Sequence, residues 1–446
     1  MDEGFSGVVR ISNISDFIAP NLNCIIPLEE NTVKTPVQTE VVLRRKEAIP
    51  TVKVDKNAIK ISLNDCLACN GCITSAETVL VQEQSLDKLL EGIANKSLSV
   101  VTVSPQSVVS IAAKRGLSPS AAAQLISAFF ISKGVTYVVD SSFGRYLSLI
   151  YSYDEFVTSS NRRPLLASAC PGFVCYAEKT HGKLLPPLIS RVRSPQAIHG
   201  ALVKDYLAKV NNLSACSIFH ATVMPCFDKK LEASREDFLV PGTSYRETDC
   251  VVSSGELEAA LQASSVLQLN PEALPAGWLG NFGRGQLIGN PGTTSSGGYA
   301  DFIAEKLALA NSLETRTSQL AKNLVVTEIG PVDQVQLRVA RIYGFRNIQN
   351  LVRKLKTRKA TYDYVEVMAC PGGCGNGGGQ VRGETTEERD STLKSVEQLY
   401  SSLAYNDESE LQRVTAEWSA LNPDWRGLIF TDYHAVDTNV RQQLAW

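Results

Sequence analysis

The sequence has no apolar run that approaches the roughly 20 residues needed to span a bilayer. Its charges are almost balanced, with 44 basic and 46 acidic side chains among 446 residues, so nothing favours nucleic acid or an anionic membrane as a partner. The opening residues MDEGFSGVVRISN carry acids where a signal or transit peptide needs bases. These absences predict a soluble intracellular protein, long enough for two or three domains.

Histidine is also scarce, and the four histidines show no spacing typical of a metal site. We expect His181, His199 and His220 to be structural, while His434 lies in the C-terminal tail. The serine, histidine and aspartate residues form no nucleophile elbow. The side chains left for chemistry are the cysteines.

Cysteine is the residue in excess, with 11 copies. Disulfides are rare in the reducing cytosol, and an odd count fits a disulfide framework poorly. Buried thiols, metal ligands and nucleophiles remain as explanations. Their positions along the chain have to decide among these.

From Leu98 onward, short β-rich runs alternate with helical patterns. Ser118 and Pro119 fit the N-cap and first position of a helix that ends at Gly134. The strand candidates are SLSVVTVSP, VTYVVD, PLLASA, SIFHATV, DCVVSS and DYVEVMA, and further helix candidates are residues 194–210 and 300–313. This βαβ rhythm predicts an α/β fold with a parallel sheet covered on both faces.

Three of these strands lead directly into a cysteine: Cys170 after PLLASA, Cys226 after SIFHATVMP and Cys370 after DYVEVMA. In open α/β sheets, ligand sites gather beyond the carboxyl ends of the strands. Three thiols at the same relative position therefore predict one shared site.

A glycine-dense loop, ACPGGCGNGGGQ, adds Cys374 four residues after Cys370. Its glycines permit positive φ angles and let backbone N–H groups approach a cluster sulfur closely. A phosphate-binding loop is the competing interpretation. That interpretation leaves the paired cysteines unexplained, and the Lys-Ser/Thr ending of such loops is absent.

A second cysteine group precedes the βαβ region. DCLACNGCITSAE spaces Cys66, Cys69 and Cys72 so that a tight loop presents three thiolates to one small cluster. Bacterial ferredoxins place a fourth cysteine four residues further on, for a second cluster, and here that position is Ala76. One cluster is therefore predicted, with Cys24, the only cysteine upstream, as candidate fourth ligand. The alternatives are a zinc site for the triad and a buried thiol for Cys24.

Three segments together resemble the signatures of iron-only hydrogenases: ASACPGF the first, MPCFDKKLE the second and EVMACPGGCGNGGGQ the third. TDCVVSSGEL is similar to a further segment of that family, and the resemblance covers most of the chain. It implies an iron-only-hydrogenase-like, two-lobed α/β scaffold with parallel sheets, plus a small ferredoxin-like N-terminal segment. It also implies a [4Fe-4S] cluster between the lobes, bound by Cys170, Cys226, Cys370 and Cys374.

The sequence departs from the hydrogenases where they relay protons. Ala169 stands at the position of the cysteine that serves the two-iron subsite, and a methyl group cannot transfer a proton. We therefore expect no hydrogenase activity. Lys229 matches the lysine that contacts a cyanide of that subsite in hydrogenases, although a lysine also suits an anionic cluster without a subsite.

This pattern is similar to the nuclear prelamin A recognition factor-like family of the cytosolic iron–sulfur protein assembly machinery. The resemblance implies two [4Fe-4S] clusters, one on Cys24, Cys66, Cys69 and Cys72 and one on the four strand-end cysteines. It implies a cytoplasmic, and also nuclear, component that helps to pass pre-assembled clusters from an early scaffold to apoprotein clients. Transfer is expected through a targeting complex that includes a WD40-propeller protein. A redox enzyme of the hydrogenase type and a zinc-stabilised interaction protein are the competing functions.

The last residue, Trp446, follows Leu444 and Ala445. Family members and some clients similarly end in an apolar, a small or acidic, and an aromatic residue that docks on the targeting complex. An indole beside a free carboxylate suits a pocket with a basic residue; a chance terminal tryptophan is the alternative. We divide the chain into an N-terminal cluster segment (1–95), a two-lobed domain (96–400) and a C-terminal helical tail (401–446).

Three cysteines stay outside both predicted sites. Cys175, five residues after Cys170, is either a stand-in ligand or a packed thiol. Cys216 and Cys250 are expected in the core, at the starts of strands.

Overall fold

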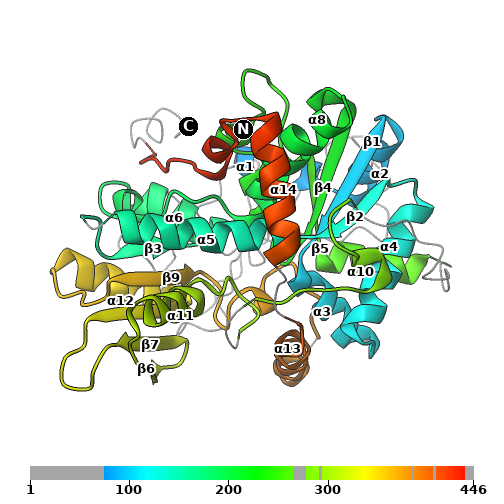
Figure 1. Cartoon of the computed structure of the whole chain (residues 1–446). Coiled ribbons are helices and arrows are strands. Elements are labelled where there is room, and N and C mark those ends of the chain that lie inside the picture. The colour runs from blue at the N-terminus through cyan, green and yellow to red at the C-terminus, as the bar shows by residue number, and fades with distance from the viewer. Residues whose placement is uncertain are drawn as a thin grey trace, which may run out of the picture.

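The computed structural model describes residues 75–159, 161–264, 278–290, 294–383, 385–404 and 408–436 (Figure 1). Two β-sheets and the helices packed on them form two lobes. One large apolar core lies on one face of the first sheet, and a second core extends from the opposite face of that sheet to the second sheet. The predicted ligands Cys24, Cys66, Cys69 and Cys72, together with Trp446, lie outside the described residues. Among the helices that are described, none is long and apolar enough to cross a membrane. The division at residues 95 and 400 stays a prediction.

The first sheet has four parallel strands in the order β2-β1-β4-β5, which confirms the predicted parallel sheet. Its strands are β1 (Leu98–Val103), β2 (Tyr137–Asp140), β4 (Ile218–Met224) and β5 (Cys250–Ser253). Every side chain of β1 and β4 is buried, as central parallel strands covered on both faces require. Alternate residues of β1 point to opposite faces: Val101 and Val103 join one core, and Leu98 and Val100 join the other.

Helices cover this sheet in the predicted rhythm. The helix predicted after Ser118 is α4, in which the Ser118 side chain accepts a hydrogen bond from the backbone N–H of Ala121 and Pro119 occupies the first turn. The helix predicted at 194–210 is a continuous helical segment with a π-helical stretch (Leu202–Leu207) in its middle. The helices of this part of the chain are α2 (Leu86–Ala94), α3 (Pro105–Arg115), α4 (Pro119–Ser132), α7 (Pro195–Ala201), α8 (Ala208–Val210), α9 (Asp228–Ala233) and α10 (Ser254–Ala263).

The second sheet has five strands in the order β3-β9-β8-β7-β6. They are β3 (Leu165–Ala167), β6 (Thr315–Ala321), β7 (Leu324–Ile329), β8 (Leu337–Tyr343) and β9 (Tyr364–Met368). β3 and β8 flank β9 in parallel, whereas β6, β7 and β8 form an antiparallel meander. This meander was not predicted from the sequence, because β6 is an edge strand with mostly exposed side chains and carries no apolar pattern.

The remaining helices surround the second sheet and the junction of the lobes (Figure 1). They are α1 (Ser75–Glu83), α5 (Ser142–Thr158), α6 (Pro171–His181), α11 (Tyr299–Asn311), α12 (Phe345–Lys356), α13 (Thr386–Ser401) and α14 (Glu408–Leu421). α14 packs through the fully buried Trp418, which stacks on Trp425 at 4.8 Å between ring centroids.

The two outlying cysteines assigned to the core differ in their surroundings. Cys250 is buried at the first residue of β5, as predicted. Cys216 is only partly buried, in a 3-10 turn (Ala215–Ser217) that precedes β4, so its predicted core position is wrong. The reason is that the buried strand starts later, at Ile218.

Candidate metal centre

The four strand-end cysteines meet where the two sheets face each other. Cys226 follows β4 of the first sheet, Cys170 follows β3 of the second, and Cys370 and Cys374 follow β9. The charges of Cys170, Cys370 and Cys374 all raise the pKa of Cys226, and these three thiols are also coupled to one another in pairs. Strands from two sheets therefore bring the four thiols near one another.

Cys170 occupies the N-cap position of α6, whose first residue is Pro171. The Cys170 backbone N–H donates to the Ser168 hydroxyl at 3.1 Å, and that hydroxyl donates to the carbonyl of Val367 on β9 at 2.6 Å. The backbone N–H of Ala369 donates to the Cys170 sulfur at 3.4 Å. The loops after β3 and β9 are thus locked together immediately before their cysteines.

The glycine-dense loop packs directly against the loop that carries Cys226. The Gly379 N–H donates to the Pro225 carbonyl at 3.0 Å, and a Cβ added to Gly377 would lie 2.2 Å from that same oxygen. Gly372 and Gly373 have φ angles of 77° and 82°, which favour glycine. The glycines therefore permit the close approach of the Cys374 and Cys226 loops.

A serine that the sequence analysis did not single out contacts the fourth thiol. The Ser296 hydroxyl donates to the Cys374 sulfur at 3.5 Å. Its neighbour Ser295 donates to Glu397 of α13 through both its N–H (3.0 Å) and its hydroxyl (2.5 Å). In the sequence, Ser296 lies in the segment NPGTTSSGGY, where no local signal relates it to a cysteine 78 residues away.

Burial governs the electrostatics of the site. It raises the pKa of Cys170 to about 12 and the pKa values of Cys226 and Cys370 well above their ordinary value, and the repulsion between neighbouring thiolates adds to this. The pKa of Cys374 is raised by burial as well, opposed by the hydrogen bond from Ser296 and by the charge of Lys229. Four thiols in this setting ionise only when positive charge is placed among them, and bound metal supplies such charge.

Lys229 is buried beside this site but has partners of its own. Its ammonium group lies 2.7 Å from the Glu232 carboxylate and donates to the Ser194 hydroxyl at 3.0 Å. Gln196 donates to the same Glu232 carboxylate at 2.9 Å. This lysine is therefore neutralised within the protein while its charge still acts on Cys374.

The donor set consists of thiols, the ligands that iron–sulfur clusters take. Among the described residues, no three His, Cys, Asp or Glu side chains converge closely enough to hold one metal ion. A cube with an iron at each of four corners binds every thiolate to a different iron, so its ligands surround a larger volume. Cys175 stands apart from this group: burial raises its pKa to about 12, and the charges acting on it belong to Lys179, Asp228, Glu178 and Arg235.

Comparison with known proteins agrees with this geometry. The family model described as the C-terminal domain of the iron only hydrogenase large subunit matches residues 97–378. A protein of Caenorhabditis elegans named probable cytosolic Fe-S cluster assembly factor oxy-4 is 54% identical, with 100% of both chains covered. The cytosolic iron-sulfur assembly component 3 of Mus musculus is 40% identical, with 98% of both chains covered.

Solved structures of iron-only hydrogenases share the fold. A hydrogenase from Chlamydomonas reinhardtii matches with a TM-score of 0.62 at 24% identity, covering 78% of this chain and 98% of that one. Another, from work on oxygen inactivation of the enzyme, matches with a TM-score of 0.62 at 23% identity, covering 78% and 99%. These likenesses confirm the predicted two-lobed, hydrogenase-like scaffold.

The family predicted from the cysteine pattern is thus confirmed by relatives aligned over the full length of the chain. These relatives are 54% and 40% identical to the chain, whereas the two hydrogenase structures are 23% and 24% identical. The protein belongs to the family of cytosolic iron–sulfur cluster assembly factors, built on the fold of the iron-only hydrogenase large subunit.

Proposed function

We propose that this protein is a non-enzymatic component of cytosolic iron–sulfur protein assembly that carries two [4Fe-4S] clusters and helps to transfer pre-assembled clusters to apoproteins. The observation that carries the proposal is the meeting of Cys170, Cys226, Cys370 and Cys374 at the junction of two sheets. An enclosed, all-thiol site of this kind suits a cluster that stays bound. The names of the relatives support the pathway and the cytosolic location, and we include the nucleus as a second location.

The cluster content is tested by anaerobic purification followed by iron, sulfide and zinc analysis and paramagnetic resonance. Two four-iron cubes correspond to about eight irons and eight sulfides per chain. Cys370→Ser is expected to remove about half of both. Cys175→Ser, the same change on a neighbouring thiol outside the group, should leave the content unchanged. A colourless protein with zinc and no sulfide would overturn the proposal in favour of a zinc-stabilised interaction protein.

We assign the second cluster to Cys24, Cys66, Cys69 and Cys72, and we propose that it is the labile one. Thiolates in a surface loop can exchange a cluster by ligand replacement, whereas the internal site is enclosed by three ligand loops. After anaerobic reconstitution, timed chelation should remove the N-terminal cluster before the internal one. The loss of the N-terminal cluster is measured by its paramagnetic resonance signal in the Cys370→Ser variant. Equal rates of loss from the two sites would contradict this assignment.

The absence of hydrogenase activity rests on Ala169 and on the pairing of Lys229. Ala169 offers no proton donor, and the Lys229 ammonium is engaged by Glu232 and Ser194. We expect no hydrogen evolution from reduced dye and no infrared bands of iron-bound carbon monoxide or cyanide. Either signal would favour the alternative of a hydrogenase-type redox enzyme.

The partners we propose are an early cluster scaffold, apoprotein clients and the targeting complex with its WD40-propeller protein, reached through Trp446. Deletion of Trp446 should weaken capture of the propeller protein while the iron and sulfide content stays the same. Unchanged capture would remove this role for the terminal tryptophan.

A further inference from the structure

A group of exposed cations lies at the C-terminal end of α12. Between Arg346 and Lys359 the chain has six basic residues and no acid. Arg353 and Lys356 of the last turns of α12 are exposed, as are Arg358 and Lys359 just beyond it. We call these four residues, together with the exposed Lys183 in the turn after α6, the basic patch.

Helix stability alone does not account for the basic patch. Cations in the last turn of a helix complement its dipole, but that effect falls off within one turn, and Arg358 and Lys359 lie outside the helix. None of the five patch residues takes part in any ion pair found among the described residues. The opposite face of α12 is apolar and buried, so the patch faces solvent.

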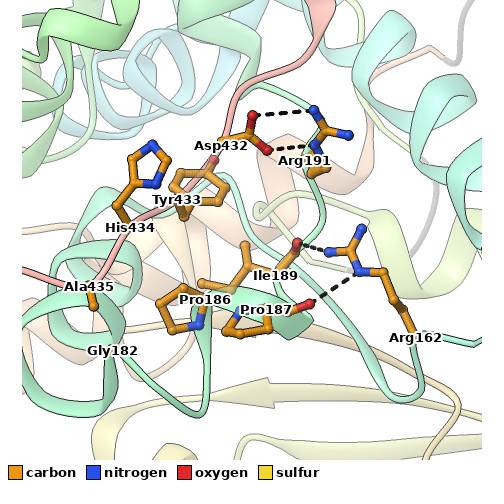
Figure 2. Close-up of a pocket in the computed structure, with 10 residues that line it drawn as sticks. All are labelled: Arg162, Gly182, Pro186, Pro187, Ile189, Arg191, Asp432, Tyr433, His434 and Ala435. Carbon is orange, nitrogen blue, oxygen red and sulfur yellow. Dashed lines mark hydrogen bonds and ion pairs between the residues drawn. The ribbon is translucent and has the colours of Figure 1, made fainter.

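The basic patch adjoins the place where the C-terminal tail leaves the body of the protein. The charge of Lys356 acts on His181, the last residue of α6. The next residue, Gly182, touches Ala435 of the tail so closely that a Cβ at Gly182 would lie 2.4 Å from the Ala435 Cβ. Figure 2 shows Ala435 beside Gly182 at the rim of a pocket of about 530 Å³.

The tail is fixed to the protein up to this point. Asp432 pairs with Arg191 at 2.7 Å (Figure 2), and two tail N–H groups, of His434 and Val436, donate to the side chain and carbonyl of Glu178. Trp446 is the tenth residue after Val436, which limits the distance between them to at most about 36 Å. A protein that holds Trp446 is therefore confined to the surroundings of Val436, which include the turn that carries Lys183.

We propose that the basic patch contacts an acidic face of the same protein that captures Trp446. The proposal rests on the proposed function for the identity of that partner. Carboxylates on a protein surface complement five cations that have no ion-pair partner in the described part of the chain. Such a contact increases the rate of association and adds to the affinity that the tryptophan alone provides. A nucleic acid fits less well, because Tyr362, which accepts a hydrogen bond from Lys354 next to Arg353 in the chain, is buried and offers no surface for base stacking.

The test uses the full chain, loaded with its clusters, and the purified targeting complex as probe. The variant Arg353→Glu/Lys356→Glu reverses two patch charges. Its matched control is Lys114→Glu/Lys133→Glu, which makes the same change at two exposed cations at helix C-terminal ends in the other lobe. We expect the patch variant to bind about tenfold more weakly at low ionic strength, with the difference shrinking as salt rises, and the control to bind as wild type.

The outcomes separate the inference from the function on which it rests. If the patch variant binds the complex as wild type does while deletion of Trp446 weakens binding, the proposed role of the basic patch is wrong and the role of Trp446 remains. Equal loss in the patch variant and the control would also overturn it, because the effect would then be one of net charge. A third outcome would be that the wild type binds a short DNA duplex more tightly than it binds the targeting complex, and that the patch variant no longer binds the duplex. The ligand of the basic patch would then be a nucleic acid and not an acidic protein. Iron content checks that each variant is folded and loaded.

Discussion

Lys179 of α6 and Glu77 of α1 form a two-pronged ion pair, with the lysine nitrogen 2.6 and 2.8 Å from the two carboxylate oxygens. α6 begins directly after Cys170, and Glu77 lies five residues after Cys72. The pair thus joins the helix that starts at the internal thiol site to the helix that follows the N-terminal cysteine triad. Both side chains are largely buried, at 13% and 22% exposed, so solvent screens this contact less than a surface pair.

A second set of contacts holds α1 near its C-terminal end. The Gln84 side chain donates to the Lys230 carbonyl at 2.9 Å, and the Lys230 ammonium donates to the Gln84 carbonyl at 2.6 Å. Between these ends, Val81 packs against Phe227 and Leu231, which follow Cys226. α1 is therefore bound to two of the segments that carry internal thiols.

We predict that Lys179→Ala speeds the loss of the N-terminal cluster. Removing a charged hydrogen-bond partner costs about 1.5–3 kcal/mol, and about 1.4 kcal/mol already corresponds to a tenfold change in an equilibrium constant. The measurement is the rate of chelation of the N-terminal cluster in a Cys370→Ser background. Lys183→Ala, an exposed lysine four residues along the chain, is the control. Identical chelation rates in the two variants would mean that the docking of α1 does not matter for retention.

We predict that Gly377→Ala disrupts the internal site. A Cβ at this position would lie 2.2 Å from the backbone oxygen of Pro225, which cannot rotate away, and overpacking of this kind costs about 1–3 kcal/mol. Gly427→Ala is the matched control, because a Cβ there meets nothing within 4 Å. Iron bound per chain should fall only in the first variant. Full occupancy in Gly377→Ala would show that the two ligand loops can separate without loss of the cluster.

We predict that Ser296→Ala lowers the reduction potential of the internal cluster. The hydroxyl donates to the Cys374 sulfur, and a donor to a ligating sulfur favours the reduced, more negative state. One hydrogen bond of about 0.5–1.5 kcal/mol corresponds to roughly 20–65 mV for a one-electron couple. A redox titration followed by paramagnetic resonance measures the shift. Ser296→Thr, which keeps the hydroxyl, should stay near the wild-type potential; a shift as large as that of the alanine variant would point to packing instead.

We predict that two buried histidines make the protein less stable in mild acid. Burial lowers the pKa values of His199 and His220 to about 3. The His199 ring accepts a hydrogen bond from the Gly144 N–H. The His220 ring is hydrogen-bonded to the Thr102 hydroxyl and to the Glu247 carbonyl. An unfolded histidine titrates near 6.5, so the unfolded chain binds more protons as the pH falls below that value. Stability is then present above pH 6.5 and is lost progressively toward pH 3.

The expected loss between pH 7 and pH 5.5 is about 1 kcal/mol per histidine. Denaturant midpoints measured anaerobically at the two pH values check this. His220→Gln lowers stability at both pH values because it replaces a hydrogen-bonded ring, but it should flatten the dependence on pH. His434→Gln, on an exposed tail residue, should leave the dependence as it is in the wild type. An unchanged slope in His220→Gln would assign the acid sensitivity to other groups.

Local patterns in the sequence were sufficient to predict several buried strands and one helix start. Burial on both faces makes a parallel strand continuously apolar, so β1, β4 and β9 were predictable from short windows. The helix start at Ser118 and Pro119 was equally local, since capping involves neighbours within one turn. The exposed edge strand β6 has no such pattern, because no single core face selects its residues.

The candidate site likewise has features with a local sequence signal and features that depend on tertiary packing. The position of each cysteine at a strand end was the local signal for a shared site of Cys170, Cys226 and Cys370. Strand ends meet within one sheet, however, and Cys226 follows a strand of the first sheet while Cys170 and Cys370 follow strands of the second, so only the packing of the two sheets decides how close they come. The contact between Ser296 and the Cys374 sulfur, the pairing of Lys229 with Ser194 and Glu232, and the closeness of the basic patch to the tail all join residues distant in sequence. Such contacts carry no local pattern, since they depend on how separate elements pack, and packing alone decides them.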